Sequence, residues 1–311
     1  MKVALLAGGT GGAKLAHGFA QVLAPGELSV IVNVGDDTEL HGLHVSPDID
    51  SILYTLSGLL DRDTGWGVAG DTRTALAMLE RLGAERTWFG IGDADLATHV
   101  RRTQLLRDGA SLTDATAAMA TALGISARIL PATDDRLRTM IGTDAGELDF
   151  QDYFVGHRQE PTVTTIRLDG EGTARASRAA VAAVRDADLV VIGPSNPVVS
   201  IGPILALGDL RAAVREHGAV AVSPIIDGRA LKGPADRMLA SLGEEATAVG
   251  VARRYVGVAA TFVLDETDAD LAPRIAELGL EPRVLPTVMR SDADRATLAT
   301  ALLEGGGTIR A

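Results

Sequence analysis

Two kinds of segment alternate along this 311-residue chain: short apolar runs and longer stretches rich in alanine and leucine. Runs in which almost every residue is apolar are typical of strands buried on both faces of a parallel sheet. Such runs occupy residues 2–7, 28–34, 188–192, 219–222 and 261–264, and a shorter one lies near 283–285. We therefore predict that these runs are strands of one buried sheet.

The stretches between the apolar runs predict helices. The first covers residues 13–24, the second begins near Asp48, and others fit 72–82, 93–106, 111–123 and 292–303. Ser111 and Asp114 stand at the spacing of a capping box, with Asp in place of the usual Glu. Strands that alternate with helices in this way predict an α/β fold, a Rossmann-like parallel sheet flanked by helices.

The alternation is interrupted once, where short extended pieces and turns replace helical stretches. The interruption runs from about residue 127 to about residue 170, after which strand and helix patterns resume. We find no repeat and no low-complexity tract. We therefore predict a single domain over residues 1–311, with an inserted mixed or β-rich subdomain at about 127–170.

Composition narrows the possible partners. The net charge is −12, and nucleic acids and anionic membranes both require a basic surface, so we expect neither as a partner. The chain has no cysteine, which excludes disulfides, thiolate metal sites and a cysteine nucleophile. No apolar stretch reaches transmembrane or signal-peptide form, so we expect a cytoplasmic protein that acts on small molecules.

A glycine-rich turn follows the first predicted strand directly. It reads Gly8-Gly9-Thr10-Gly11-Gly12, and Lys14 lies one turn further on. Exposed backbone N–H groups at a helix N-terminus favour an anion, and glycines allow a phosphate to approach closely. The segment matches neither a P-loop nor a dinucleotide fingerprint. We predict phosphate binding; the alternative is a tight strand-to-helix connection.

Four aspartates lie close together in the sequence. Asp36 and Asp37 follow the second predicted strand, where ligands of open α/β sheets bind, and Asp48 and Asp50 begin the next helix. Carboxylates beside a diphosphate suit Mg²⁺, and one of them could instead accept a proton from an attacking hydroxyl. Asp48 could also be only a helix cap.

A second polar group lies on the helix predicted from residue 93. Asp95 and His99 are spaced i, i+4 and so share one face of that helix. Arg101, Arg102 and Arg107 extend the helix and could meet an anionic substrate or simply face solvent. The chain contains no serine-hydrolase elbow and no zinc-hydrolase motif.

Two histidines and two tryptophans complete the set of candidates. His41 and His44 flank the acidic cluster, and without a third ligand at suitable spacing they favour a surface or hydrogen-bonding role. Trp66 and Trp88 stand out in a chain with 3% aromatic residues. A flat ligand could stack on one of them, but we predict that both are buried in the core.

Taken in order, these motifs resemble the 2-phospho-L-lactate transferase family of deazaflavin coenzyme biosynthesis, including its phosphoenolpyruvate-transferring members. The matching segments span most of the chain: Gly8–Lys14, Val32–Asp37, Ser46–Asp50, Gly92–His99, Gly193–Pro203 and Val222–Ile226. Each segment alone is a weak signal, whereas the ordered set is specific to this family.

The resemblance implies a reaction and a set of roles. A guanosine diphosphate ester of lactate or enolpyruvate gives its phospho-acid to a hydroxyl of the deazaflavin Fo, and GMP leaves. The implied nucleotide-binding residues are Gly8, Gly9, Thr10, Gly11, Gly12, Lys14, Ser195 and Asn196. Asp36, Asp37 and Asp48 would hold Mg²⁺, Asp50 would be catalytic and face the acceptor, and Asp95 and His99 would line the acceptor side. The family also implies a homodimer. The alternative is a non-catalytic regulatory protein that binds a guanine nucleotide.

Overall fold

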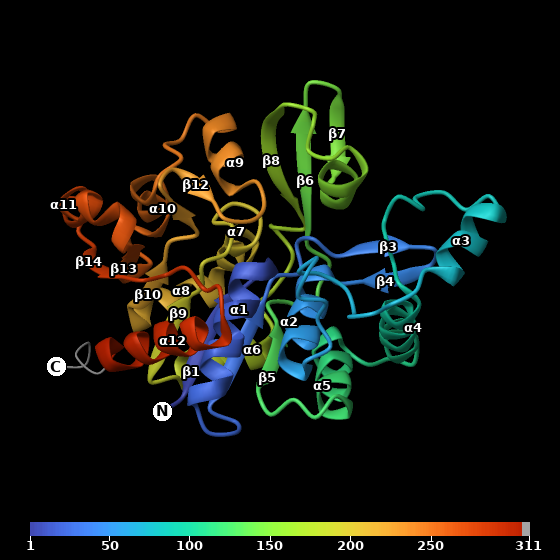
Figure 1. The fold of residues 1–311 in the computed structure, drawn as a ribbon, viewed down its shortest axis with the longest axis horizontal. Helices are drawn as coiled ribbons and strands as arrows, with labels where there is room; N and C mark the ends of the chain where they lie inside the picture. The colour runs from blue at the N-terminus through green and yellow to red at the C-terminus, as the bar shows by residue number, and fades with distance from the viewer. Residues whose placement is uncertain (307–311) are drawn as a thin grey trace.

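A parallel sheet of seven strands forms the centre of the molecule in a computed structural model that describes residues 1–306 (Figure 1). The strand order is β14-β13-β10-β9-β1-β2-β5. The strands are β1 (Val3–Ala7), β2 (Leu28–Val32), β5 (Arg128–Pro131), β9 (Leu189–Ile192), β10 (Ala219–Val222), β13 (Ala259–Asp265) and β14 (Glu281–Leu285). The predicted α/β fold with a parallel sheet is therefore confirmed.

Continuous apolar sequence explains why these strands lie in the middle. Every residue of β1, β2, β9 and β10 is buried, which requires cover on both faces of the sheet. The predicted strands all belong to the sheet, and their bounds differ from the prediction by at most two residues. The sheet also contains β5, whose sequence we assigned to the inserted region.

Helices cover this sheet, and α1, α2 and α12 lie side by side (Figure 1). They are α1 (Gly9–Val22), α2 (Pro47–Ser57), α3 (Thr74–Arg81), α4 (Asp93–Arg107), α5 (Leu112–Ala122), α6 (Arg178–Arg185), α7 (Ile201–Ala206), α8 (Gly208–His217), α9 (Ala235–Ser241), α10 (Ala248–Tyr255), α11 (Ala272–Ala276) and α12 (Asp292–Gly306). The predicted cap is confirmed, because the Ser111 hydroxyl accepts a hydrogen bond from the Asp114 N–H. Within residues 1–306, none of these helices has the length and apolar character needed to cross a membrane.

Smaller β elements extend from the carboxyl edge of the sheet. A three-stranded antiparallel sheet of β7-β6-β8 projects at the top of Figure 1. The remaining elements are the hairpin of β3 (Thr38–Leu40) and β4 (Leu43–Val45), then β6 (Arg138–Thr143), β7 (Gly146–Asp149), the π-helical turn η1 (Asp152–Gly156), β8 (Val163–Asp169), β11 (Ile225–Ile226), β12 (Arg229–Ala230) and the 3₁₀ turn η2 (Glu266–Leu271). The chain leaves the main sheet only after β5, so this projection starts later than residue 127.

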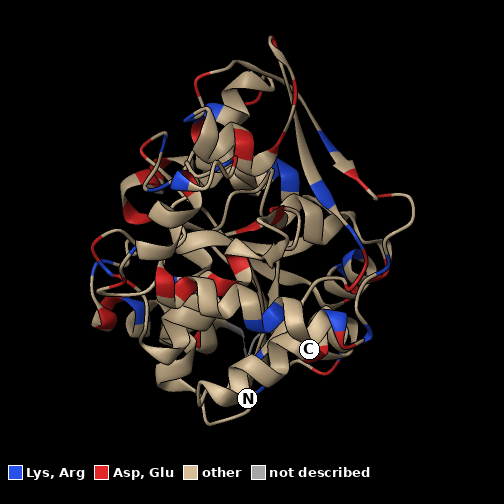
Figure 2. Cartoon of the chain, turned by 90° about the vertical axis from the view of Figure 1, so that its right-hand side faces the viewer, with Lys and Arg blue, Asp and Glu red and all other residues tan. Residues whose placement is uncertain are grey.

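Charged residues of both signs are interspersed on the side of the molecule shown in Figure 2. The sequence as a whole carries a net charge of −12.

Candidate functional site at the carboxyl edge of the sheet

The glycine turn lies where β1 ends, and two side chains from distant segments hold it. The Gly8 N–H donates to the Ser195 hydroxyl at 3.1 Å, and the Gly9 N–H donates to Asp48 Oδ1 at 2.7 Å. Gly9 has φ +61°, a conformation that favours glycine. Helix α1 begins at Gly9, earlier than predicted, because the Asp48 carboxylate accepts a hydrogen bond at its N-terminus.

Close packing explains two further glycines of the turn. A Cβ at Gly11 would lie 2.1 Å from the Pro194 carbonyl oxygen, and one at Gly12 would lie 2.7 Å from the Ser195 hydroxyl. The turn therefore serves as a tight strand-to-helix connection as well as a candidate anion site. The Asn196 Oδ1 accepts a hydrogen bond from the Val198 N–H of its own loop at 2.9 Å, and its Nδ2 contacts the Met238 sulfur of α9 at 3.4 Å.

Asp48 and Asp36 form a buried acidic pair beside the turn. Asn33, directly after β2, donates to Asp48 Oδ2 at 2.9 Å and to the Val199 carbonyl at 3.2 Å. Burial raises the pKa of Asp48 to about 6, against the hydrogen bonds from Asn33 and Gly9 that lower it. Burial also raises the pKa of Asp36 well above its usual range, and the Asp48 charge adds to this. The two carboxylates therefore disfavour each other's ionisation.

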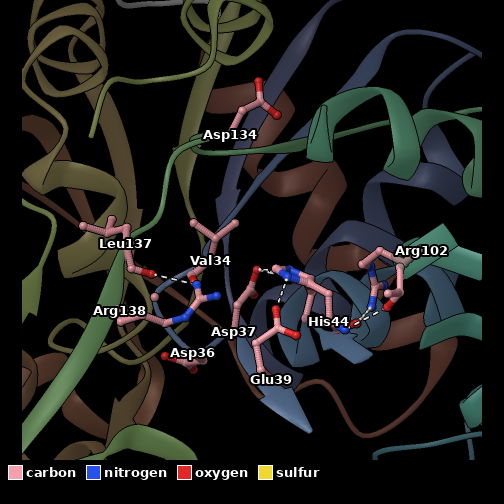
Figure 3. A network of polar contacts seen from close by, with 12 residues as sticks. Val34, Asp36, Asp37, Glu39, His44, Arg102, Asp134, Leu137 and Arg138 are labelled. Atoms are coloured by element: carbon pink, nitrogen blue, oxygen red, sulfur yellow. Dashed lines mark hydrogen bonds and ion pairs between the residues drawn. The ribbon is translucent and has the colours of Figure 1, made fainter. Parts of the chain in front are cut away.

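Asp37 has a different environment, although it is next in sequence. Its Oδ2 accepts hydrogen bonds from the Ser46 hydroxyl at 2.9 Å and from His44 Nε2 at 3.0 Å. His44 Nδ1 contacts Glu39 at 3.1 Å, so this imidazole lies between two carboxylates (Figure 3). The expected hydrogen-bonding role of His44 is confirmed.

Asp50 forms part of a buried polar chain. Both of its oxygens accept hydrogen bonds from Arg102, one of them from Nη1 at 3.2 Å, and Arg102 is completely buried. His99 lies between two acids, with Nδ1 3.6 Å from Asp50 and Nε2 3.3 Å from Asp95. Tyr54 donates its hydroxyl to Asp95 at 2.6 Å. The structure thus brings Asp50, Asp95 and His99 together, as the sequence suggested.

The buried charges of Asp50, Asp95, His99 and Arg102 face partners within this polar group. Although burial opposes it, the charge and hydrogen bonds of Asp50 raise the pKa of Arg102. Burial likewise favours neutral Asp95, but the adjacent His99 imidazole and the hydrogen bond from Tyr54 hold the pKa of Asp95 below its usual value. Arg102 is neither a solvated residue nor free to meet a substrate, because its guanidinium is committed to Asp50.

Two groups of acids could therefore hold a cation. Within residues 1–306, Asp50, Asp95 and His99 form the one group whose possible ligand atoms all lie within 4.8 Å of one another. The predicted ligands Asp36, Asp37 and Asp48 do not converge to that extent. However, Asp36 and Asp37 each have a buried Oδ1 with no hydrogen-bond partner among the described residues. Oxygen ligands of this kind suit Mg²⁺.

The two tryptophans are exposed, so the prediction that they lie in the core is wrong. Trp66 is 50% exposed and Trp88 is 38% exposed. Each ring is covered by a guanidinium instead, that of Arg73 at 5.6 Å from Trp66 and that of Arg86 at 5.4 Å from Trp88. Trp66, Arg73 and Asp95 line a cavity of about 150 Å³. A flat ligand could lie there against Trp66, close to the buried polar group of Asp50, Asp95 and His99.

Comparison with known proteins identifies the family. A family model described as 2-phospho-L-lactate transferase CofD matches residues 3–282. The chain belongs to this family. The matched range includes the glycine turn, the four aspartates and the polar group of Asp50, Asp95 and His99. The family resemblance that the motifs indicated is therefore confirmed.

Relatives of this transferase family align along almost their full length. A 2-phospho-L-lactate transferase of Methanosarcina mazei is 37% identical over 300 residues, which covers 96% of this chain and 99% of the relative. A phosphoenolpyruvate transferase of Mycobacterium tuberculosis is 39% identical over 327 residues and covers 95% and 99%. The names of these two relatives specify different transferred groups, phospholactate and phosphoenolpyruvate. Both relatives have nearly the same sequence identity to this chain, so identity does not distinguish between the two groups.

Solved structures agree on the fold. A UPF0052 family protein of Bacillus halodurans superposes with a TM-score of 0.64, over 97% of this chain and 98% of the other, at 15% sequence identity. At that identity the likeness concerns the architecture alone. The homodimer and the cytoplasmic location stay predictions.

Proposed function

We propose that this protein transfers a phospholactyl or phosphoenolpyruvyl group from a guanosine diphosphate-linked donor to a side-chain hydroxyl of the deazaflavin Fo. GMP and F420-0, or its dehydro form, are the products. One observation carries the proposal: in a chain of this family, the buried carboxylate of Asp48 meets the glycine turn at the carboxyl edge of the sheet. Substrates of open α/β folds bind at that edge.

The reaction is a displacement at phosphorus. The acceptor oxygen forms a bond to the phosphorus that carries the acid, and the bond from that phosphorus to the bridging oxygen breaks. The electron pair leaves with GMP, and the acceptor proton passes to a carboxylate. Positioning and charge neutralisation are the main contributions of the protein in such reactions.

Two carboxylates compete for the proton. Asp50 is the predicted catalytic residue, and its pairing with Arg102 fixes its orientation. Asp48 is the rival if it is not a ligand of Mg²⁺, because burial raises its pKa to about 6, a value that suits a general base near neutral pH. Measuring kcat/KM against pH for Asp48→Asn and Asp50→Asn distinguishes them. The residue that acts as base is the one whose substitution removes the acidic limb of the profile.

Magnesium belongs to the proposal as well. Among residues 1–306, neither Asp36 nor Asp48 forms an ion pair with a lysine or arginine, whereas Asp50 has Arg102. A phosphate at the glycine turn would meet the Asp48 carboxylate there. We therefore assign Mg²⁺ to Asp36, Asp37 and Asp48, where it would neutralise both the carboxylates and the diphosphate.

The test uses purified protein, Mg²⁺, Fo and each guanylylated donor in turn. We expect a product whose mass is that of Fo plus the phospho-acid, together with an equal amount of GMP. The Asp50→Asn variant should lose turnover while still binding GDP. Binding of GDP to the wild type without product from either donor would support the regulatory protein instead.

A further inference from the structure

A separate cavity of about 200 Å³ adjoins the glycine turn. We call it the cationic cavity. Its lining includes Thr10 and Lys14 of α1, Thr55 of α2, and three cations from distant parts of the chain: Arg62, Lys232 and Arg295. Thr10 belongs to the glycine turn, so the cavity is a direct extension of the candidate site.

The charge of this lining is unusual for so acidic a protein. Four cationic side chains face one acid, Asp63, around the cavity, while the whole chain carries a net charge of −12. Outside the lining, Asp292 pairs with Arg62 at 3.2 Å and with Arg295 at 3.1 Å. His17 lies 3.9 Å from the same carboxylate. Even with both acids counted, positive charge is in excess.

The environment of Lys14 disfavours its positive charge. Burial lowers the pKa of Lys14, and the nearby charges of Arg295 and Lys232 lower it further. An anion in the cavity would relieve this repulsion, since opposite charge favours the protonated amine.

Two buried polar groups of the lining have no hydrogen-bond partner within residues 1–306. They are the Thr55 hydroxyl and the Nε of Arg295, in residues that are 6% and 8% exposed. A buried donor without a partner is costly, and such groups normally have one. Both groups can donate to an anion in the cavity.

The cations are held in place by the backbone. Lys14 Nζ donates to the Met289 carbonyl at 3.1 Å, and Lys232 Nζ donates to the Thr64 carbonyl at 3.1 Å. Arg295 is brought to the cavity because α12 packs closely on α1 at Gly18, where a Cβ would lie 2.2 Å from the Arg295 carbonyl oxygen. Helix α12 lies outside the matched range of 3–282.

The size of the cavity limits what it can hold. One water needs a cavity volume of roughly 10–15 Å³, and pockets for drug-sized ligands have volumes of roughly 300–1,000 Å³. At about 200 Å³ the cavity suits a compact anion rather than a whole nucleotide. Arginine and lysine together favour carboxylate and phosphate oxygens.

We propose that the cationic cavity binds the phosphorylated carboxylic acid portion of the donor, and that Lys232 and Arg295 contact its carboxylate. The proposal rests on the proposed transferase function. It assigns recognition of the acid to residues far from the glycine turn in sequence. The phosphorus would then lie toward Thr10, between the cavity and the Asp48 side of the turn.

Calorimetric titration of the free acids tests the proposal. Phosphoenolpyruvate, 2-phospholactate and inorganic phosphate are titrated into the wild type, Arg295→Gln, Lys232→Gln and the control Arg290→Gln. Arg290 is exposed just before α12 and does not line the cavity, so its variant makes the same change in net charge. Lys232 is also exposed, so its variant keeps the fold even where Arg295→Gln does not.

We expect the wild type to bind both phospho-acids more tightly than phosphate. Arg295→Gln and Lys232→Gln should each raise the Kd at least about tenfold, the size of losing one charge-assisted hydrogen bond, and the control should change it less than about twofold. No binding to the wild type, or an unchanged Kd in both variants, would overturn the proposal. Phosphate binding as tight as that of the phospho-acids would overturn the assignment of the carboxylate.

The Fo transfer assay separates this proposal from the proposed function. If no donor gives product but Arg295→Gln still abolishes binding of phosphoenolpyruvate, the function fails and the cavity assignment stands. If transfer proceeds and the donor KM is unchanged in both variants, the function stands and the cavity assignment fails.

Discussion

Replacing Asp48 with asparagine should change how the stability of the protein depends on pH. The wild-type carboxylate accepts hydrogen bonds from the Gly9 N–H and from Asn33, while burial and its acidic neighbours oppose its ionisation. Asparagine has nearly the same shape and no charge. Its oxygen can still accept a hydrogen bond from Gly9, but its NH₂ group would face the NH₂ group of Asn33. The lost hydrogen bond should lower the free energy of unfolding by about 0.5–1.5 kcal/mol at every pH.

The pH-dependent part follows from the raised pKa of Asp48. Between its ordinary value of 3.8 and about 6, the folded state binds a proton that the unfolded state has released. Wild-type stability therefore falls as pH rises through that window. At about 1.36 kcal/mol per pH unit, the fall amounts to about 3 kcal/mol. Asp36 adds to it in the same direction, because the Asp48 charge raises its pKa as well.

Urea unfolding followed by tryptophan fluorescence, with a chelator present, measures the effect. The free energy of unfolding of Asp48→Asn minus that of the wild type should rise by about 3 kcal/mol from about pH 4 to about pH 7. Asp144→Asn, at an exposed turn, is the control and should give a flat difference. At about pH 7.5, saturating Mg²⁺ should stabilise the wild type more than Asp48→Asn.

A flat difference for Asp48→Asn across this pH range would contradict a raised pKa of Asp48 in the folded protein. It would mean that the carboxylate is as well solvated in the folded protein as in the unfolded chain. Equal stabilisation of both proteins by Mg²⁺ would remove Asp48 from the proposed metal ligands, whatever the pH profile shows.

Two further substitutions test the structural roles assigned to the site. Arg102→Met removes the guanidinium that pairs with the buried Asp50 carboxylate and should cost roughly 3–5 kcal/mol in urea unfolding. The added Asp50→Asn change should restore much of that loss, and a loss below about 1 kcal/mol would contradict a buried ion pair. Gly11→Ala places a methyl group 2.1 Å from the Pro194 carbonyl oxygen and should lower the free energy of unfolding by about 1–3 kcal/mol. The control Gly172→Ala, with no atom within 4 Å of the new methyl group, should change it by less than about 0.5 kcal/mol. Equal effects of the two substitutions would contradict close packing at Gly11.

Local pattern was sufficient to predict six of the seven strands of the sheet, all except β5. Strands such as β9 and β10 are short, uniformly apolar and buried, so periodicity and burial carry the same information. The start of α1 was predicted too late, because its first turn is made of glycines that have no helical propensity of their own. The Asp48 carboxylate supplies the missing support from another segment.

The partners in the site could not be predicted in the same way. Arg102 lies in a polar helix whose sequence resembles a solvated face, and its burial depends on Asp50, which is separated from it by 52 residues. Asn33 did carry a signal, since it follows β2 directly, but nothing local connects it to Asp48. Arg295 joins the cationic cavity only because α12 packs on α1. Such contacts are long-range, and sequence spacing does not encode them.

The transfer of the phospho-acid to Fo can be followed at its phosphorus atoms in a single reaction mixture. Wild-type protein, Mg²⁺, Fo and one guanylylated donor are followed by ³¹P NMR. We expect the diphosphate signals to be replaced by those of one phosphodiester and one phosphomonoester, GMP, in equal amounts. Release of GMP together with the free phospho-acid, with no phosphodiester of Fo from either donor, would contradict this transfer.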